Sequence, residues 1–136
     1  ETGDDRYILT LTGIARFRIA EELPVTTPYR QCRVGYDDYL IDFTARAGED
    51  AVDRNALLKA LRAFAKASEL KIDWKGVNEA PNEALVNALS MMCPFGPREK
   101  QALLESHTLQ ERAETLLTLL QMGVFDAGGK PDGPSQ

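Results

Sequence analysis

The sequence has few of the residues that build metal sites and disulfide frameworks. It holds one histidine and two cysteines, Cys32 and Cys93, with no CxxC pair. A single histidine without a nearby cysteine pair cannot complete a four-ligand metal site, and two distant cysteines favour a reducing compartment. No apolar run reaches the roughly 20 residues that a membrane helix requires. We therefore expect a cytoplasmic protein with no metal, no cofactor and no membrane partner.

The chain also lacks an excess of positive charge. Its formal net charge is -5, and its acidic and basic residues are interspersed. A nucleic-acid surface needs a clustered excess of Lys and Arg, so the charge argues against nucleic acid as a partner. At 136 residues the chain suits one domain, or two small subdomains that share a core.

The first third of the chain is rich in strand-forming residues. Three runs predict strands: residues 7–12, 14–19 and 29–36. In the second run, period-two alternation turns Ala15, Phe17 and Ile19 inward. Arg16 and Arg18 then face solvent. Three strands leave an open edge and a bare face, so we expect missing N-terminal residues and self-association through the open sheet edge.

The rest of the chain has helical periodicity. After an irregular linker at 37–49, four helices are predicted: from Asp50 or Asp53 to Ser68, from 78–81 to Met92, from Gly96-Pro97 to Glu105, and from Thr108 to Gly123. Thr108 and Glu111 have the spacing of a capping box. Residues 70–74 form a short extended piece. The predicted class is therefore α+β, with a partial antiparallel sheet in 1–49, a bundle of about four helices in 50–125 and a disordered Gly/Pro-rich tail in 126–136.

Three segments, in this order, carry a resemblance to a known family. Residues 11–19, Leu-Thr-Gly-Ile-Ala-Arg-Phe-Arg-Ile, are similar to a Gly-x-x-Arg-Phe strand; residues 24–29 followed by Arg33-Val34 match a Pro-Tyr segment and its strand; residues 99–105 and 111–117 look like a closing helical pair. The chain thus resembles the N-terminal substrate-binding domain of Lon proteases, an ATP-dependent protease La domain. It looks most like the small stand-alone bacterial proteins that carry this domain.

The resemblance implies a PUA-like β-domain followed by a helical subdomain, with the first strands absent here. It also implies recognition of protein or peptide segments, including unfolded ones, without catalysis. The chain has no Gly-x-x-x-x-Gly-Lys-Ser/Thr loop for an ATPase. Ser135 lies in a tetrad similar to that around the Lon catalytic serine, but no protease domain surrounds it, so we reject it as a nucleophile.

Large apolar residues in or beside connections are the candidate peptide-binding site: Trp74, Met91, Met92 and Phe95. Methionine adapts to varied partners, and exposed apolar patches mark binding surfaces. The alternative is that these residues seal the sheet against the helices.

Other polar residues have plainer interpretations. We expect His107 to be a solvent-facing linker residue, the cysteines to pack as small hydrophobes, and Asp37, Asp38 and Asp42 to form a solvated acidic face. A PUA-like module could also bind RNA, which is the alternative function. Its basic strip would consist of four arginines on adjacent strands: Arg16, Arg18, Arg30 and Arg33.

Overall fold

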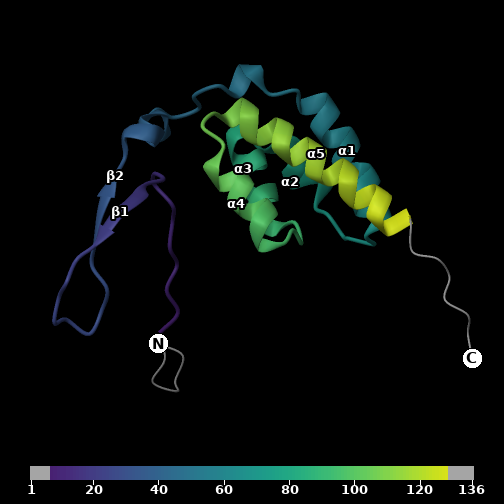
Figure 1. The fold of residues 1–136 in the computed structure, drawn as a ribbon. Coiled ribbons are helices and arrows are strands. Elements are labelled where there is room, and N and C mark those ends of the chain that lie inside the picture. Colours follow the sequence, from purple (N-terminus) through teal and green to yellow (C-terminus); the bar gives the residue numbers. More distant parts are fainter. Residues whose placement is uncertain (1–6, 129–136) are drawn as a thin grey trace, which may run out of the picture. The chain divides into compact units, whose positions relative to one another are not determined.

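The computed structural model describes residues 7–128, and the chain divides into two units between Ala45 and Arg46. The first unit contains the strands and the second contains the α-helices (Figure 1). The predicted α+β class, an antiparallel sheet followed by helices, is confirmed. Each unit has its own packing.

The first unit is built on a two-stranded antiparallel sheet, β1 (Arg18–Glu22) and β2 (Cys32–Gly35). The pairing begins with Arg18 opposite Gly35. After β2 the chain turns into the 3-10 helix η1 (Asp37–Phe43). Since β2 ends there, it offers no partner to the residues that precede β1.

Residues 7–17 consequently form no strand, and the predicted strand at 7–12 is wrong. Figure 1 draws this segment as an extended trace leading into β1. Phe17 is 51% exposed and Ile19 is 65% exposed, so the prediction that they face inward is also wrong. The residues of this segment have high strand propensity, but a strand also needs a neighbouring strand with which to form backbone hydrogen bonds.

The centre of the first unit is Tyr39, which is only 3% exposed. The Arg16 guanidinium lies 4.3 Å from the centroid of the Tyr39 ring. Arg16 also donates three hydrogen bonds to the Asp42 carboxylate, from its backbone N, Nε and Nη2, at 2.9, 2.8 and 2.7 Å. The predictions of an outward Arg16 and a solvated Asp42 are therefore wrong, because the two pair over an aromatic ring that partly shields them from water.

The second unit consists of helices. Their bounds are η2 (Glu49–Ala51), α1 (Arg54–Ala67), α2 (Trp74–Glu79), α3 (Asn82–Met92), α4 (Pro97–Glu105) and α5 (Leu109–Gly128). Helix α5 packs along α1, as Figure 1 shows, and also contacts α3 and α4. Six side chains are almost fully buried: Leu57, Leu61, Val86, Leu103, Leu116 and Leu120. Each contributes about 1.5–3 kcal/mol of hydrophobic stabilisation.

Side-chain caps predicted from the sequence begin α1 and α5. The Asp53 carboxylate accepts a hydrogen bond from the Ala56 N–H at 2.9 Å, so the cap of α1 is Asp53 rather than Asp50. Thr108 Oγ1 accepts from the Glu111 N–H at 3.1 Å, and the Glu111 carboxylate accepts from the Thr108 N–H at 3.3 Å. The predicted capping box is confirmed.

The short helix α2 was not predicted. Trp74 begins it, whereas the sequence predicted an extended piece at 70–74. Asp73 caps it by accepting from the backbone N–H groups of Lys75 and Gly76, at 3.1 and 3.2 Å. A helix of only six residues is too short to show the apolar periodicity by which helices are recognised in a sequence.

Helix α5 continues to Gly128, so the predicted end at Gly123 is wrong. A Cβ built on Gly123 would lie 2.5 Å from Phe64 Cε2. Glycine at this position therefore serves close packing of α5 on α1 rather than helix termination. Of the predicted tail 126–136, the first three residues are helical and the others lie outside the described residues. Within residues 7–128 no helix has the length and apolar character needed to span a bilayer.

Candidate functional site

Met91 and Met92 form an exposed pair in the last turn of α3. The buried stripe of this helix comprises Leu85, Val86 and Leu89, and Cys93 follows at the same helical spacing. Met91 falls on another face and is 69% exposed, whereas Met92 has the helical spacing of Leu85 and Leu89 but is 81% exposed at the last residue of the helix, so the prediction that it joins the buried stripe is wrong. The rigid end of a packed helix thus presents two flexible apolar side chains to solvent.

Lys100 and Leu104 of α4 extend this exposed region. Lys100 Nζ donates a hydrogen bond of 3.0 Å to the backbone oxygen of Met91, one of the terminal carbonyls of α3 that lack a helical partner. Leu104 follows Lys100 by four residues, so the two share a face of α4, and Leu104 is half-exposed. We call Met91, Met92, Lys100 and Leu104 the methionine surface.

Sequence reasoning missed Lys100 and Leu104. The available signal was the pair Leu103-Leu104: two adjacent residues of a helix cannot both face one core. Leu103 is 1% exposed, which leaves Leu104 for the surface.

Trp74 and Phe95 are less exposed than the two methionines. Both are half-buried and pack against the helical core. The ring centroid of Phe95 lies 6.0 Å from that of Phe64, and the Arg62 guanidinium lies 5.5 Å from the centroid of the Trp74 ring. These contacts serve packing within the second unit, whereas the two methionines are free of such cover.

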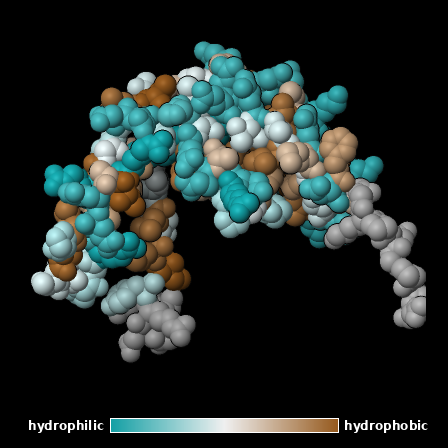
Figure 2. All heavy atoms as spheres, viewed as in Figure 1, coloured by the Kyte–Doolittle hydropathy of each residue, from teal (hydrophilic) through white to brown (hydrophobic). Residues whose placement is uncertain are grey.

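A second apolar surface lies in the first unit. Figure 2 shows apolar side chains following the extended segment that precedes β1. The exposed residues of this segment are Tyr7, Ile8, Leu9, Leu11, Ile14 and Phe17. Their exposure follows from the missing strand partner described above.

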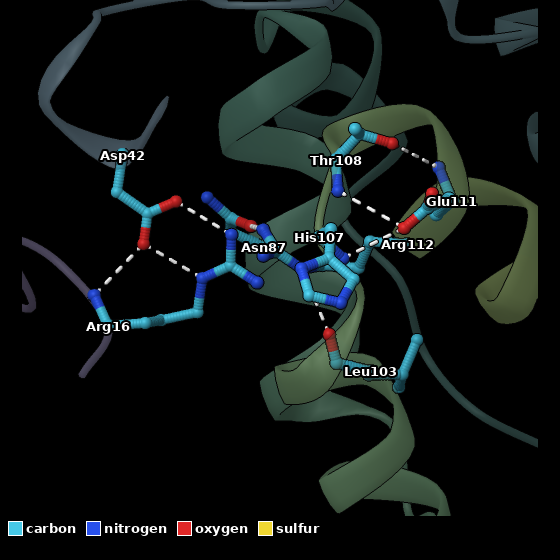
Figure 3. A network of polar contacts seen from close by, with 8 residues as sticks. All are labelled: Arg16, Asp42, Asn87, Leu103, His107, Thr108, Glu111 and Arg112. Carbon is cyan, nitrogen blue, oxygen red and sulfur yellow. Dashed lines mark hydrogen bonds and ion pairs between the residues drawn. The ribbon is translucent and has the colours of Figure 1, made fainter. Parts of the chain in front are cut away.

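Polar groups tie the helices together beside the core (Figure 3). Arg112 of α5 donates from Nε to the Leu103 carbonyl oxygen at 3.0 Å and from Nη1 to Asn87 Oδ1 at 2.7 Å. One side chain therefore joins α5 to α4 and α3. His107 is exposed, as predicted, and its backbone N–H donates to Glu111.

Glu49 is the buried acidic group of the second unit, at 7% exposed. Its carboxylate accepts from the Glu83 backbone N–H at 2.9 Å and from Arg46 Nε at 2.6 Å. The Glu83 N–H and, after it, the Arg46 guanidinium hold the pKa of Glu49 below its usual value. Pro81 precedes α3 and provides no side-chain cap, so Glu49 supplies the missing acceptor from a distant segment.

Metal-ligating residues and thiols are further candidate parts of a site. Within 7–128 no three His, Cys, Asp or Glu side chains are grouped to hold a metal ion. Cys93 is buried, as core packing predicts, and burial raises the pKa of its thiol. Ser135 lies outside the described residues. A wide, open hollow of about 600 Å³ lies in the connection between β1 and β2, lined by Glu22, Leu23, Pro24, Val25, Thr27, Pro28, Tyr29 and Arg30.

Comparison with curated proteins found no match, and comparison with solved structures found none. Comparison with protein families gave a match to the ATP-dependent protease La (LON) substrate-binding domain over residues 1–122. The match includes the strands, the first four α-helices and most of α5, and therefore both apolar surfaces. The chain belongs to the LON substrate-binding domain family.

Proposed function

We propose that this chain is a non-catalytic module that binds exposed or unfolded segments of other proteins through its methionine surface. The family is named for substrate binding, which supports a recognition role. The observation that carries the proposal is the exposure of Met91 and Met92 beside the buried Cys93. A packed helix end holds the pair in place, while the side chains themselves remain adaptable.

The chemistry of the methionine surface suits an apolar segment with polar flanks. Methionine fills irregular gaps and tolerates differing partners, which a module for varied substrates needs. Lys100 is held next to Met91 by its hydrogen bond to the backbone oxygen. A carboxylate or a backbone carbonyl of the bound segment could accept from the remaining donors of this ammonium group.

The test replaces both methionines by glutamine, which preserves side-chain length and removes apolar character. The probe is a reduced and alkylated, permanently unfolded protein carrying a fluorophore, and binding is followed by anisotropy. M91Q/M92Q should raise Kd by about tenfold or more, as expected when central apolar contacts are lost. M122Q is the matched control, because Met122 is also exposed but lies on α5.

Two outcomes would refute this proposal. The first is an unchanged Kd for M91Q/M92Q. The second is loss of helical circular dichroism in the same variant, which would mean that the pair stabilises the fold rather than binding a partner. Because both side chains are exposed, we expect the unfolding midpoint to stay close to that of the parent chain.

RNA binding has less support than protein binding. All four arginines of the proposed basic strip pair with carboxylates: Arg16 with Asp42, Arg18 with Asp38, Arg30 with Glu22 and Arg33 with Glu21. Paired guanidinium groups add little to the positive potential that phosphates require. We therefore propose a protein partner, and a salt-sensitive complex with single-stranded RNA would contradict this choice.

We also place this function in the cytoplasm. Cys32 and Cys93 both carry free thiols. Cys32 lies in the first unit and Cys93 in the core of the second, so each is accommodated as a thiol, the form that a reducing compartment maintains.

A further inference from the structure

All three methionines of the chain are exposed: Met91, Met92 and Met122. Methionine is among the residue types most often found fully buried, so this distribution is unusual. The large side chains that are fully buried in the helical core are those of leucine and valine. A chemical change at a methionine therefore leaves the packing of this core intact.

We propose that Met91 and Met92 form a reversible oxidation site that regulates the methionine surface: a hydroperoxide converts their thioethers to sulfoxides and thereby weakens binding of the protein segment. This inference rests on the proposed function, because the binding that oxidation weakens is the binding proposed above. Oxidation replaces an apolar, flexible side chain by a polar one, and methionine-rich contact surfaces are disrupted by this change.

The oxidation step transfers one oxygen atom to sulfur. A lone pair of the methionine Sδ attacks the hydroxyl oxygen of the hydroperoxide, and the S–O bond forms as the O–O bond breaks. The proton of that hydroxyl passes to the leaving oxygen, which departs as water or an alcohol. Sulfur is oxidised by two electrons and the peroxide is reduced by two. A sulfoxide reductase reverses the change, because two thiols supply two electrons and two protons, become a disulfide and release the oxygen as water.

The structure separates the exposed thioethers from the neighbouring thiol. Cys93 directly follows Met92 in the chain but is buried. Burial raises the pKa of its thiol, and a cysteine reacts with oxidants through its thiolate. At this end of α3 the accessible sulfur atoms are therefore those of the two methionines.

The position of the pair concentrates the effect of oxidation on the methionine surface. Met91 and Met92 are adjacent in the last turn of α3, and with Leu104 they supply the apolar part of that surface. Two sulfoxides would leave Leu104 as its one apolar side chain. We therefore expect oxidation of the pair to raise Kd by about tenfold or more, the effect also expected of M91Q/M92Q. Met122 lies on α5, and its oxidation should leave Kd unchanged.

The experiment measures Kd for the alkylated unfolded protein by anisotropy, before and after the whole chain is treated with hydrogen peroxide. The peroxide is removed before the unfolded protein is added, and peptide mass spectrometry gives the sulfoxide fraction at each methionine. M91L/M92L keeps apolar side chains of similar volume but cannot form these sulfoxides, and its own Kd before treatment is its reference. M122L is the matched control. Both variants retain Cys32, so an effect of thiol oxidation would appear in both.

Treatment should raise Kd at least about tenfold in the parent chain and in M122L, and should leave the Kd of M91L/M92L within about twofold of its reference. Methionine sulfoxide reductases for both sulfoxide epimers, supplied with dithiothreitol, should restore the Kd of the parent.

Four results would each overturn the proposal. They are an unchanged Kd with sulfoxide at both positions, an equal rise of Kd in M91L/M92L, loss of helical circular dichroism on oxidation, and unreacted Met91 and Met92 in a chain whose Met122 is oxidised. If M91Q/M92Q weakens binding but oxidation does not, this inference alone fails. If the untreated parent does not bind the unfolded protein, the proposed function fails and this inference fails with it.

Discussion

Substituting Gly123 by alanine tests how closely α5 packs on α1. At an open helix position, Gly→Ala stabilises a helix by about 1 kcal/mol. Here the added Cβ would lie 2.5 Å from Phe64 Cε2 and 2.9 Å from Phe64 Cδ2. Phe64 is only 4% exposed and contacts Phe95, so the ring has little room to move away. Overpacking of this kind costs about 1–3 kcal/mol, and we predict a net destabilisation of up to about 2 kcal/mol.

The assay is urea unfolding of the whole chain, followed by far-ultraviolet circular dichroism. The decisive control is a second background, F64L, which lacks the ε carbon nearest to Gly123. In that background G123A should be stabilising by up to about 1 kcal/mol, because only the helix propensity remains. If G123A stabilises both backgrounds equally, Phe64 does not pack against this glycine and the reasoning is refuted.

Three further predictions concern the polar groups of the second unit. The folded-state pKa of Glu49 is lowered, so the stabilisation by its carboxylate is present above the unfolded-state pKa and is lost as pH falls through the folded-state pKa. E49Q should therefore flatten the acid side of the plot of unfolding free energy against pH, measured by urea unfolding at a series of pH values. An unaltered slope would contradict this. R112A removes hydrogen bonds from a charged group to α3 and α4 and should lower the free energy of unfolding by about 1.5–3 kcal/mol in the same urea assay, whereas a loss under 0.5 kcal/mol would show that Arg112 does not tie the helices. T108A removes one acceptor of the capping box and should lower the free energy of unfolding by about 1 kcal/mol, with T108S as the conservative control that retains the cap.

The helices could be predicted from the sequence because their determinants are local. Apolar spacing predicted α1, α3, α4 and α5, and the capping residues Asp53 and Thr108 gave the starts of α1 and α5. The end of α5 could not be predicted, since glycine usually terminates helices and the reason for Gly123 is a phenyl ring 59 positions earlier in the chain.

The strands are harder to predict from the sequence because strand pairing depends on distant residues. The run at 7–12 has every local property of a strand, yet β2 ends before it could reach that run. Arg16 was predicted outward from alternation alone, whereas its partners, Tyr39 and Asp42, lie in η1. Such partners are not visible in a pattern of period two.

The candidate site was partly accessible from the sequence. The flexibility of the methionine side chain suggests from the sequence that Met91 and Met92 suit variable partners. Only the structure shows that these two are exposed, whereas Trp74 and Phe95 pack on the core. Lys100 joins the surface through a hydrogen bond to a carbonyl oxygen of the preceding helix. Backbone contacts of that kind leave no trace in composition or spacing.

The central claim is that the methionine surface contacts the bound protein segment. The chain has three methionines, so ¹³C-methyl methionine labelling gives three assignable NMR signals from Met91, Met92 and Met122. Titration with the alkylated unfolded protein should shift the signals of Met91 and Met92 and leave that of Met122 unchanged. Shifts at Met122 alone, or no shift at any methionine while anisotropy reports binding, would contradict the claim.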